Sequence, residues 1–199
     1  LRESYEAARC LDTGLTFISE KQLLKGKGDK FKLIILPAAT YMSREVFSAI
    51  DGYVKAGGNL LVLPESLLMN EYTHQMNYLE TWGIHIASTH KENIEGFGDL
   101  QHKYDQNLER QVKFGGGKVV SAAKFSDKVE PFELTISGLF QEIQADKGKV
   151  LISAIDDTPI LTKIARGSGY IWYLAGMPER ESLLNLLDLV YAKSDRKSV

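Results

Sequence analysis

The chain has 199 residues, of which 44% are hydrophobic and 25% are charged, and its formal net charge at pH 7 is −2. These are the values of a globular protein long enough to bury one core. They exclude the strongly basic balance of a nucleic-acid-binding protein, and no apolar run is long enough to cross a bilayer.

The first residue is leucine, and no targeting signal opens the chain. We therefore expect residues 1–199 to be a single domain excised from a longer protein, and the sequence predicts no compartment for it. Cys10 is the only cysteine, which excludes an internal disulfide and a thiolate metal cluster. We expect Cys10 to be a small buried or half-buried residue and not a nucleophile.

The N-terminal segment leads toward a central unit. We expect a helix over 2–12, a short strand over 15–18 and a helical turn over 20–24. The lysines and glycines of 25–32 are typical of a solvated linker.

Residues 33–66 form the unit around which the chain is organised. Residues 33–36 are a continuous apolar run, typical of a strand buried on both faces of a parallel sheet. Ser43 can cap a helix, and after Gly57 and Gly58 a second apolar strand is expected over 59–63. The helix has an apolar stripe of Val46, Phe47, Ile50, Tyr53 and Val54, and we expect Arg44, Glu45, Asp51 and Lys55 to face outward. This order predicts a right-handed βαβ unit.

The middle of the chain is harder to interpret. Approximate helical spacing predicts a helix over 67–82, which Gly83 ends, and a short strand over 84–86. Residues 87–118 are polar and show no clear pattern, and we expect 87–149 to be a variable insertion or a set of added strands. Within it, strands are expected over 119–123 and 131–136, and a helical turn over 139–143.

The last third is clearer. Strands are expected over 150–155, 160–165 and 170–174, with a tight hairpin at 166–169. An amphipathic helix follows over 182–191, and we expect the polar residues 192–199 to fray.

Ligands of open α/β sheets bind beyond the carboxyl ends of the strands, which directs attention to residues 37–42 and 64–70. Pro64, Glu65, Ser66 and Leu67 follow the second strand without flanking glycines, so we expect no strained nucleophile elbow there. Ser66 is more typical of a helix cap than of a hydrolase nucleophile, since only His74 is near it in sequence.

Other residues suggest weaker hypotheses. Glu65, Asp156, Asp157 and Glu179 come near strand ends, but carboxylates at loops are usually solvated. His85 and His90 lack a carboxylate at ligand spacing, so no metal site is predicted. Five aromatic residues can stack on a sugar or anchor an interface, although we expect Trp172 to be in the core; they are Tyr41, Tyr72, Trp82, Trp172 and Tyr173.

Four stretches carry a resemblance to a known family, namely residues 33–37, 50–60, 82–84 and 167–175. In them the chain resembles the middle domain of family 42 glycoside hydrolases, the β-galactosidase trimerisation domain. The resemblance implies an α/β fold that is three-layered, flavodoxin-like and similar to class I glutamine amidotransferases. It further implies a mostly parallel central sheet with some antiparallel strands late in the chain.

Active amidotransferases of this fold use a Cys-His-Glu triad. At the position of the nucleophile this chain has Glu65 and Ser66, and the His-Pro-Glu motif corresponds to Met177, Pro178 and Glu179. Methionine cannot accept a proton, and no cysteine is present to be activated. We therefore expect no catalytic residues and no cofactor in this domain.

The resemblance implies a noncatalytic accessory or oligomerisation domain of a β-galactosidase-like enzyme, which contacts other subunits or domains. The alternative is a carbohydrate- or small-molecule-binding module, and a divergent serine hydrolase is a third reading. Neither nucleic acid nor membrane is expected as a partner. The candidate pocket at the strand ends consists of Ala38, Thr40, Tyr41, Glu65, Ser66, Met177 and Glu179.

Overall fold

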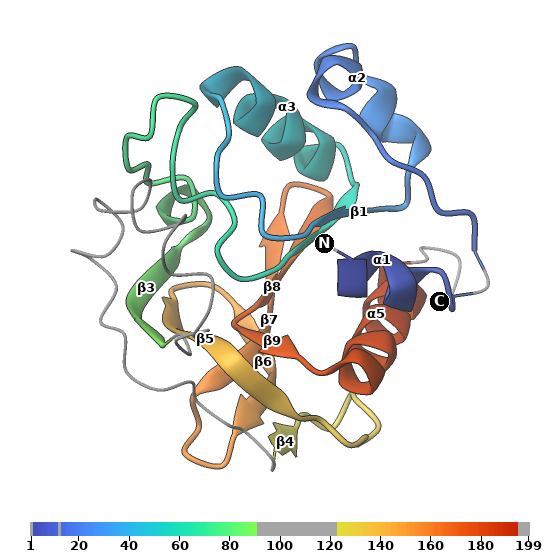
Figure 1. The fold of residues 1–199 in the computed structure, drawn as a ribbon, viewed down its shortest axis with the longest axis vertical. Helices are drawn as coiled ribbons and strands as arrows, with labels where there is room; N and C mark the ends of the chain where they lie inside the picture. The colour runs from blue at the N-terminus through green and yellow to red at the C-terminus, as the bar shows by residue number, and fades with distance from the viewer. Residues whose placement is uncertain (1, 12, 91–122, 195–199) are drawn as a thin grey trace, which may run out of the picture.

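The computed structural model describes residues 2–11, 13–90 and 123–194 (Figure 1). The N-terminal half contains α1 (Arg2–Ala8), α2 (Glu20–Leu24), the 3₁₀ turn η1 (Lys27–Lys30), β1 (Leu33–Leu36), α3 (Arg44–Lys55), β2 (Asn59–Val62), the 3₁₀ turn η2 (Glu80–Trp82) and β3 (Ile84–His90). The C-terminal half contains β4 (Ala123–Phe125), β5 (Ile136–Ala145), β6 (Lys149–Ala154), β7 (Pro159–Arg166), β8 (Gly169–Leu174), β9 (Gly176–Pro178) and α5 (Arg180–Ser194).

The predicted βαβ unit is confirmed. β1 and β2 pair in parallel, with Ile34 opposite Leu60, and α3 connects them. The Ser43 hydroxyl accepts a hydrogen bond from the Val46 amide and so caps α3. Gly57 then adopts a φ of 111°, a left-handed conformation that glycine takes without steric cost, and the chain turns back into β2.

β1 and β2 belong to a six-stranded sheet in the order β1-β2-β8-β7-β6-β4. β1, β2 and β8 are parallel neighbours, whereas the β8-β7, β7-β6 and β6-β4 pairs are antiparallel. The predicted α/β class is therefore confirmed, and the antiparallel strands do come late in the chain. Three of the five strand pairs are antiparallel, so the sheet is mixed.

A second sheet has the order β3-β5-β9, with antiparallel pairing. Its central strand covers the residues for which a helical turn was expected, 139–143, and that prediction is wrong. Ile136, Phe140 and Ile143 are buried at a spacing that imitates a helix. The strand tolerates this spacing because its register against β9 shifts between Ile136 and Phe140.

Ala175 joins the two sheets. Its N–H donates to the Ile160 carbonyl of β7, and its own carbonyl accepts from the Gln141 N–H of β5. β8 of the first sheet and β9 of the second are thus consecutive in the chain and are held together by the residue between them.

Helices lie on both sides of β1 and β2, α2 and α3 on one side and α1 and α5 on the other (Figure 1). Asn59, the first residue of β2, connects the two sides. Its carbonyl accepts from the Tyr53 hydroxyl of α3, and its side-chain amide donates to the Ser194 carbonyl of α5. α5 packs Leu183, Leu186, Leu187 and Val190 into the core, as the predicted stripe requires.

The helix expected over 67–82 is wrong except for the single turn η2. Leu67 and Thr73 have φ values of 65° and 64°, which interrupt a right-handed helix. Part of the backbone of this segment bonds to the loop after β1: the Leu67 N–H donates to the Ala39 carbonyl and the Met69 N–H to the Thr40 carbonyl. Other bonds stay within the segment but are not helical, such as that from the Met76 N–H to the Leu68 carbonyl.

Other boundaries also differ from expectation. Residues 15–18 form no strand, although they line one cavity together with β1, and of the strand expected over 131–136 only Ile136 belongs to one. α5 continues through Ser194, so residues 192–194 are helical and not frayed. The strand expected over 119–123 lies outside the described residues except for Ala123, which begins β4.

Asp51 was expected to face solvent, but its side chain is buried within an ion pair. The Arg166 guanidinium donates to both carboxylate oxygens, at 2.9 and 3.1 Å, and Trp82 Nε1 donates to Oδ1 at 2.9 Å. Lys55 adds a contact of 2.7 Å to Oδ2. Asp51 therefore links α3 to the end of β7 and to η2.

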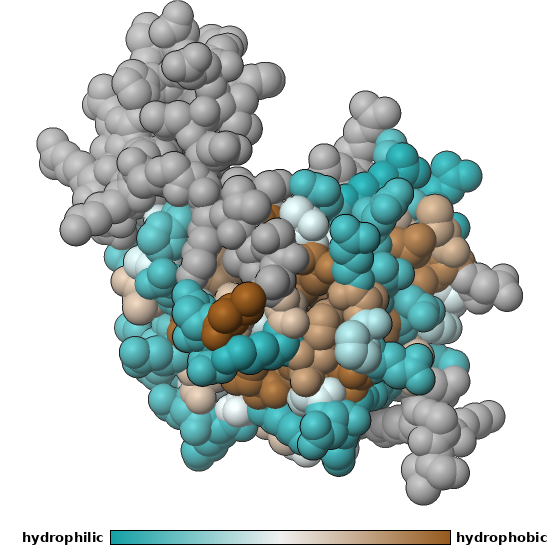
Figure 2. All heavy atoms as spheres, turned by 90° about the horizontal axis from the view of Figure 1, so that it is seen from below, coloured by the Kyte–Doolittle hydropathy of each residue, from teal (hydrophilic) through white to brown (hydrophobic). Residues whose placement is uncertain are grey.

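Most large apolar side chains are buried, among them Trp172, which confirms its expected place in the core. Figure 2 shows the end of the molecule where β4 lies, and there apolar side chains gather between hydrophilic ones. Cys10 is exposed, contrary to expectation, because α1 ends at Ala8. Among the described helices, none has the length and apolar character of a membrane span.

Candidate functional site at the strand ends

Ser66 links the loops that follow β1 and β2 by hydrogen bonds. Its hydroxyl donates to the Leu36 carbonyl and accepts from the Ala39 N–H, both at 3.1 Å. The side chain has no exposed surface. Ser66 therefore neither caps a helix nor presents a nucleophile, and it fixes the spacing of the two loops.

The same loops contain backbone strain. Ala38, Glu65 and Leu67 have φ values of 54°, 63° and 65°, in the left-handed region that residues with a Cβ disfavour. The expectation that Glu65 lacks a strained elbow is wrong, since the conformation forms without glycine. Such residues cost about 1 to 3 kcal/mol each and persist only where surrounding contacts hold them.

Gln141 supplies one of those contacts. Its Oε1 accepts hydrogen bonds from the Glu65 N–H at 3.2 Å and from the Tyr173 hydroxyl at 2.7 Å. Burial raises the pKa of Tyr173, and the nearby charge of Glu65 raises it further. The phenol therefore stays protonated and donates to Gln141 at any physiological pH.

The other predicted residues lie around these loops. Ala38 is exposed, Thr40 is half-buried, and Tyr41 is 49% exposed and bridges to Met69. Met177 lies on β9, and Glu179 is exposed at the start of α5, where its carbonyl accepts from the Leu183 N–H. The structure brings together Thr40, Tyr41 and Ser66 through the paired loops. Within the described residues, neither Met177 nor Glu179 is joined to these three by a hydrogen bond or an ion pair.

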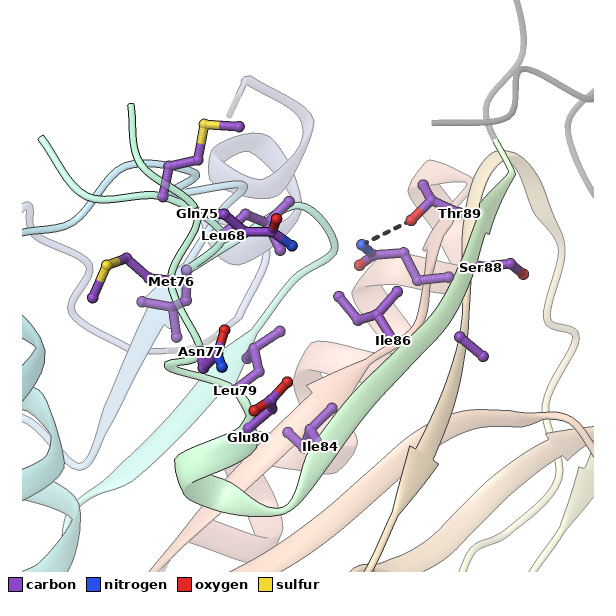
Figure 3. A pocket seen from close by; sticks show the side chains of 14 residues that line it. Leu68, Gln75, Met76, Asn77, Leu79, Glu80, Ile84, Ile86, Ser88 and Thr89 are labelled. Atoms are coloured by element: carbon purple, nitrogen blue, oxygen red, sulfur yellow. Dashed lines mark hydrogen bonds between the residues drawn. The ribbon is translucent and has the colours of Figure 1, made fainter. Parts of the chain in front are cut away.

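A cavity of about 240 Å³ opens beside the second loop (Figure 3). One wall is the segment with Leu68, Gln75, Met76 and Asn77, and the facing wall is β3. Gln141 also lines it, and its Nε2 makes one long bond of 3.4 Å to Thr89 Oγ1. None of the seven predicted residues lines this cavity.

Ser88, His90 and Glu142 form a cluster across β3 and β5. Ser88 Oγ donates to Glu142 Oε2 at 2.9 Å, and His90 Nε2 lies 3.1 Å from both Ser88 Oγ and Glu142 Oε1. In a hydrolase triad the serine and the acid contact opposite ring nitrogens, so that the acid orients the base. Here both contact one nitrogen, and the serine proton goes to the carboxylate. The cluster therefore lacks the arrangement of a nucleophile and its base.

The two histidines do have carboxylate neighbours, which their sequence positions did not indicate. His85 Nε2 lies 3.2 Å from Asp146 Oδ2, and His90 contacts Glu142. Within residues 2–11, 13–90 and 123–194, no group of three or more His, Cys, Asp and Glu residues could hold a metal ion. Asp156 and Asp157 lie in the turn between β6 and β7, in the antiparallel part of the sheet.

The aromatic residues divide into two groups. Tyr41 and Tyr72 are 49% and 71% exposed, whereas Trp82, Trp172 and Tyr173 are buried. Trp82 and Tyr173 instead donate hydrogen bonds inside the protein, to Asp51 and Gln141. A sugar-stacking surface made of all five is therefore excluded.

We predict that Ser66→Ala lowers the free energy of unfolding by about 1 to 3 kcal/mol, because it leaves the Ala39 N–H without a partner. Urea unfolding measures this change. Thr40→Ala is the matched control, since the Thr40 hydroxyl makes only a 3.5 Å bond at an exposed site. An unchanged stability in Ser66→Ala, equal to the control, would contradict the tie between the loops.

The sequence and the fold of this chain are similar to those of known proteins. A family model described as the β-galactosidase trimerisation domain matches residues 1–195. The chain belongs to this family. No protein of curated function matches the sequence significantly.

Solved structures similar to this trimerisation domain include three β-galactosidases. The enzyme from Bacillus circulans sp. alkalophilus is 18% identical with a TM-score of 0.71, and it is covered over 26% of its length by 96% of this chain. Gan42B from G. stearothermophilus is 15% identical with a TM-score of 0.71, over 96% of this chain and 25% of that protein. The Rahnella sp. R3 enzyme is 18% identical with a TM-score of 0.70, over 96% and 26%. The domain thus spans about a quarter of these proteins, and the likeness shows a shared fold.

Two features of the trimerisation domain could not be recognised in its sequence. Gln141 and the Ser88 cluster lie on strands whose sequences do not show the regular alternation of a strand. In β5 the apolar residues have helix-like spacing, and in β3 the register shifts between Ile86 and Ser88. The buried state of Gln141 had no signal in the sequence, because its partners Glu65 and Tyr173 are distant along the chain.

Proposed function

We propose that this trimerisation domain is a noncatalytic module of a longer, β-galactosidase-like glycoside hydrolase, and that it joins the subunits of that enzyme. The observation that carries the proposal is the family match over residues 1–195. The lengths of the similar β-galactosidases support it, since each has about three quarters of its chain outside the matching region.

The chemistry of the strand ends supports a noncatalytic role. The residue in the strained position after β2 is Glu65, and the adjacent Ser66 is buried with both hydrogen bonds made to backbone. The resemblance to amidotransferases assigns the position of the base to Met177 of β9, which cannot accept a proton. A nucleophile needs a base within hydrogen-bond reach, and no such pair exists in this part of the described chain.

We also assign the finer fold as three-layered and amidotransferase-like. The parallel β1, β2 and β8, the connecting helix α3 and the helices on both sides support this assignment. β4 and β5 add strands from within residues 87–149, in keeping with added strands in that region.

The edge of the sheet at β1 is the surface that we assign to subunit contact. β1 is the terminal strand of the six-stranded sheet, and an apolar cavity of about 270 Å³ lies between it, α1 and residues 15–18. Phe17 is 70% exposed there and stacks on Tyr5, with ring centroids 5.4 Å apart. Exposed aromatic residues beside an unpaired strand edge are typical of interfaces.

Light scattering after size-exclusion chromatography tests the proposal. We expect a mass three times that of one 22.3 kDa chain, and a monomer for Phe17→Glu. Ile155→Glu is the matched control, because Ile155 is similarly exposed, at 64%, in the turn after β6. A strict monomer at high concentration would contradict autonomous oligomerisation, and a trimer unaffected by Phe17→Glu would move the interface elsewhere.

A second candidate function is the binding of a neutral sugar or another small polar molecule. The Gln141 amide, 1% exposed and with one long bond from Nε2, favours it at the cavity beside β3. The seven strand-end residues are the alternative proposed location. A thermal-shift screen with neutral sugars separates the two candidates, because a ligand at saturation raises the melting temperature.

A further inference from the structure

Five lysines line one groove on the antiparallel half of the sheet. They come from β6, β7, α5 and two connecting loops, and they are Lys128, Lys147, Lys149, Lys163 and Lys193. The groove has a volume of about 600 Å³. Among the residues that the structure describes, no carboxylate lies within salt-bridge distance of any of the five.

The lysines are close enough to repel one another. Lys149 and Lys163 are directly opposite on β6 and β7, and like charges in that position destabilise a strand pair. Lys193 Nζ donates to the Lys128 carbonyl at 2.8 Å, which places the positive charge of Lys193 at the loop that contains Lys128. Burial lowers the pKa of Lys163, and the charges of Lys193 and Lys128 lower it further. The free domain therefore carries an unfavourable concentration of positive charge.

The rest of the chain has the opposite balance. The protein has 24 basic and 26 acidic residues, so gathering five lysines in one groove leaves the remaining surface markedly acidic. A concentrated patch of this kind attracts anionic partners and directs their approach.

We propose that this lysine groove is a docking site for a carboxylate-rich segment of another polypeptide. Its size and its five separate charges exceed what a single small anion can contact. Lysine offers point charges without the fork by which arginine holds phosphate in two bonds. The proposal stands apart from oligomerisation through β1, since a monomeric domain would retain the groove.

Two observations argue against nucleic acid as the occupant. The rings beside the groove are already covered: Lys163 Nζ lies 3.7 Å from the centroid of Tyr170 and 4.5 Å from that of Trp172. Single-stranded nucleic acids need open aromatic faces on which bases stack. A short carboxylate-rich segment can stay within the groove, whereas an extended polyphosphate backbone would also cross the acidic remainder of the surface, which repels it.

The test is calorimetric titration of the whole chain with a short polyglutamate peptide at low salt. We expect Lys149→Gln/Lys163→Gln to weaken binding about tenfold, since the peptide loses two charge pairs with the groove. Lys21→Gln/Lys25→Gln, on α2 and at the residue that follows it, removes the same charge outside the groove and should change affinity less than about twofold. Thermal melting checks the fold, and the groove variant should melt no lower than the parent because it relieves a repulsion.

Each outcome decides the proposal. A loss confined to the groove variant supports it. No binding of the peptide, or equal weakening in both variants, overturns it. Binding of inorganic phosphate or of an oligothymidylate as tight as that of the peptide, with the same dependence on Lys149 and Lys163, overturns the assignment to a carboxylate-rich segment.

Discussion

Asp51→Ala should lower the free energy of unfolding by about 3 to 5 kcal/mol, the usual cost of removing one partner of a buried ion pair. The loss leaves the Arg166 guanidinium and the buried Trp82 Nε1 without their acceptor. Asp188→Asn, at an exposed position of α5, is the control and should change stability by less than about 0.5 kcal/mol. Urea unfolding at neutral pH measures both. A change in Asp51→Ala no larger than in the control would show that the ion pair contributes nothing to the fold.

Asp51 also makes the free energy of unfolding depend on pH. Burial alone would raise the pKa of Asp51, but hydrogen bonds from Arg166, Lys55 and Trp82 outweigh it and hold the pKa at about 2. Because this lies below the ordinary value of 3.8, the ionised carboxylate stabilises the folded state above about pH 4. That contribution, about 2 kcal/mol, is lost as the pH falls toward 2. Asp51→Asn should remove this part of the acid dependence, and an unchanged profile would assign it to other carboxylates.

Gly169→Ala should unfold the domain or lower its stability by at least about 3 kcal/mol. A Cβ on Gly169 would lie inside the contact distance of two backbone oxygens, those of Gly58 and Val54, which cannot turn aside as a flexible side chain can. The expected effect arises from this close approach of β8 to the end of α3.

Gly52→Ala is the matched control. Gly52 lies in the middle of α3, and nothing is within 4 Å of its added Cβ. Alanine there should stabilise the protein by about 0.5 to 1 kcal/mol, because glycine loses more conformational entropy in a helix. Urea unfolding of both variants should give changes of opposite sign. A Gly169→Ala protein as stable as the parent would show that β8 and α3 can separate at little cost.

The βαβ unit could be predicted because its residues have one clear period each, continuous apolar runs for β1 and β2 and a helical stripe for α3. Over 67–82 helical spacing gave a wrong prediction, because the apolar residues there belong to a loop that hydrogen-bonds to the loop after β1. Asp51 was misplaced for a related reason. Beside Lys55 at i,i+4 it is typical of a surface pair, while its main partner Arg166 is 115 residues away.

The ligand site expected at the strand ends stays a prediction, and its internal contacts could not be read from the sequence. The rule that ligands bind beyond parallel strand ends selected the loops that Ser66 joins. The Gln141 bonds to Glu65 and Tyr173 could not be foreseen, because they depend on how a second sheet packs against the first. No local pattern in a sequence encodes such a pairing.

Ala175, which donates to β7 and accepts from β5, has a consequence for how the domain comes apart. Since neither sheet can lose its partner without breaking a main-chain bond at this residue, the two should melt as one cooperative block. Calorimetric and van't Hoff enthalpies should then agree. A polypeptide cut between β8 and β9 should yield no autonomous halves, only fragments that regain order when mixed.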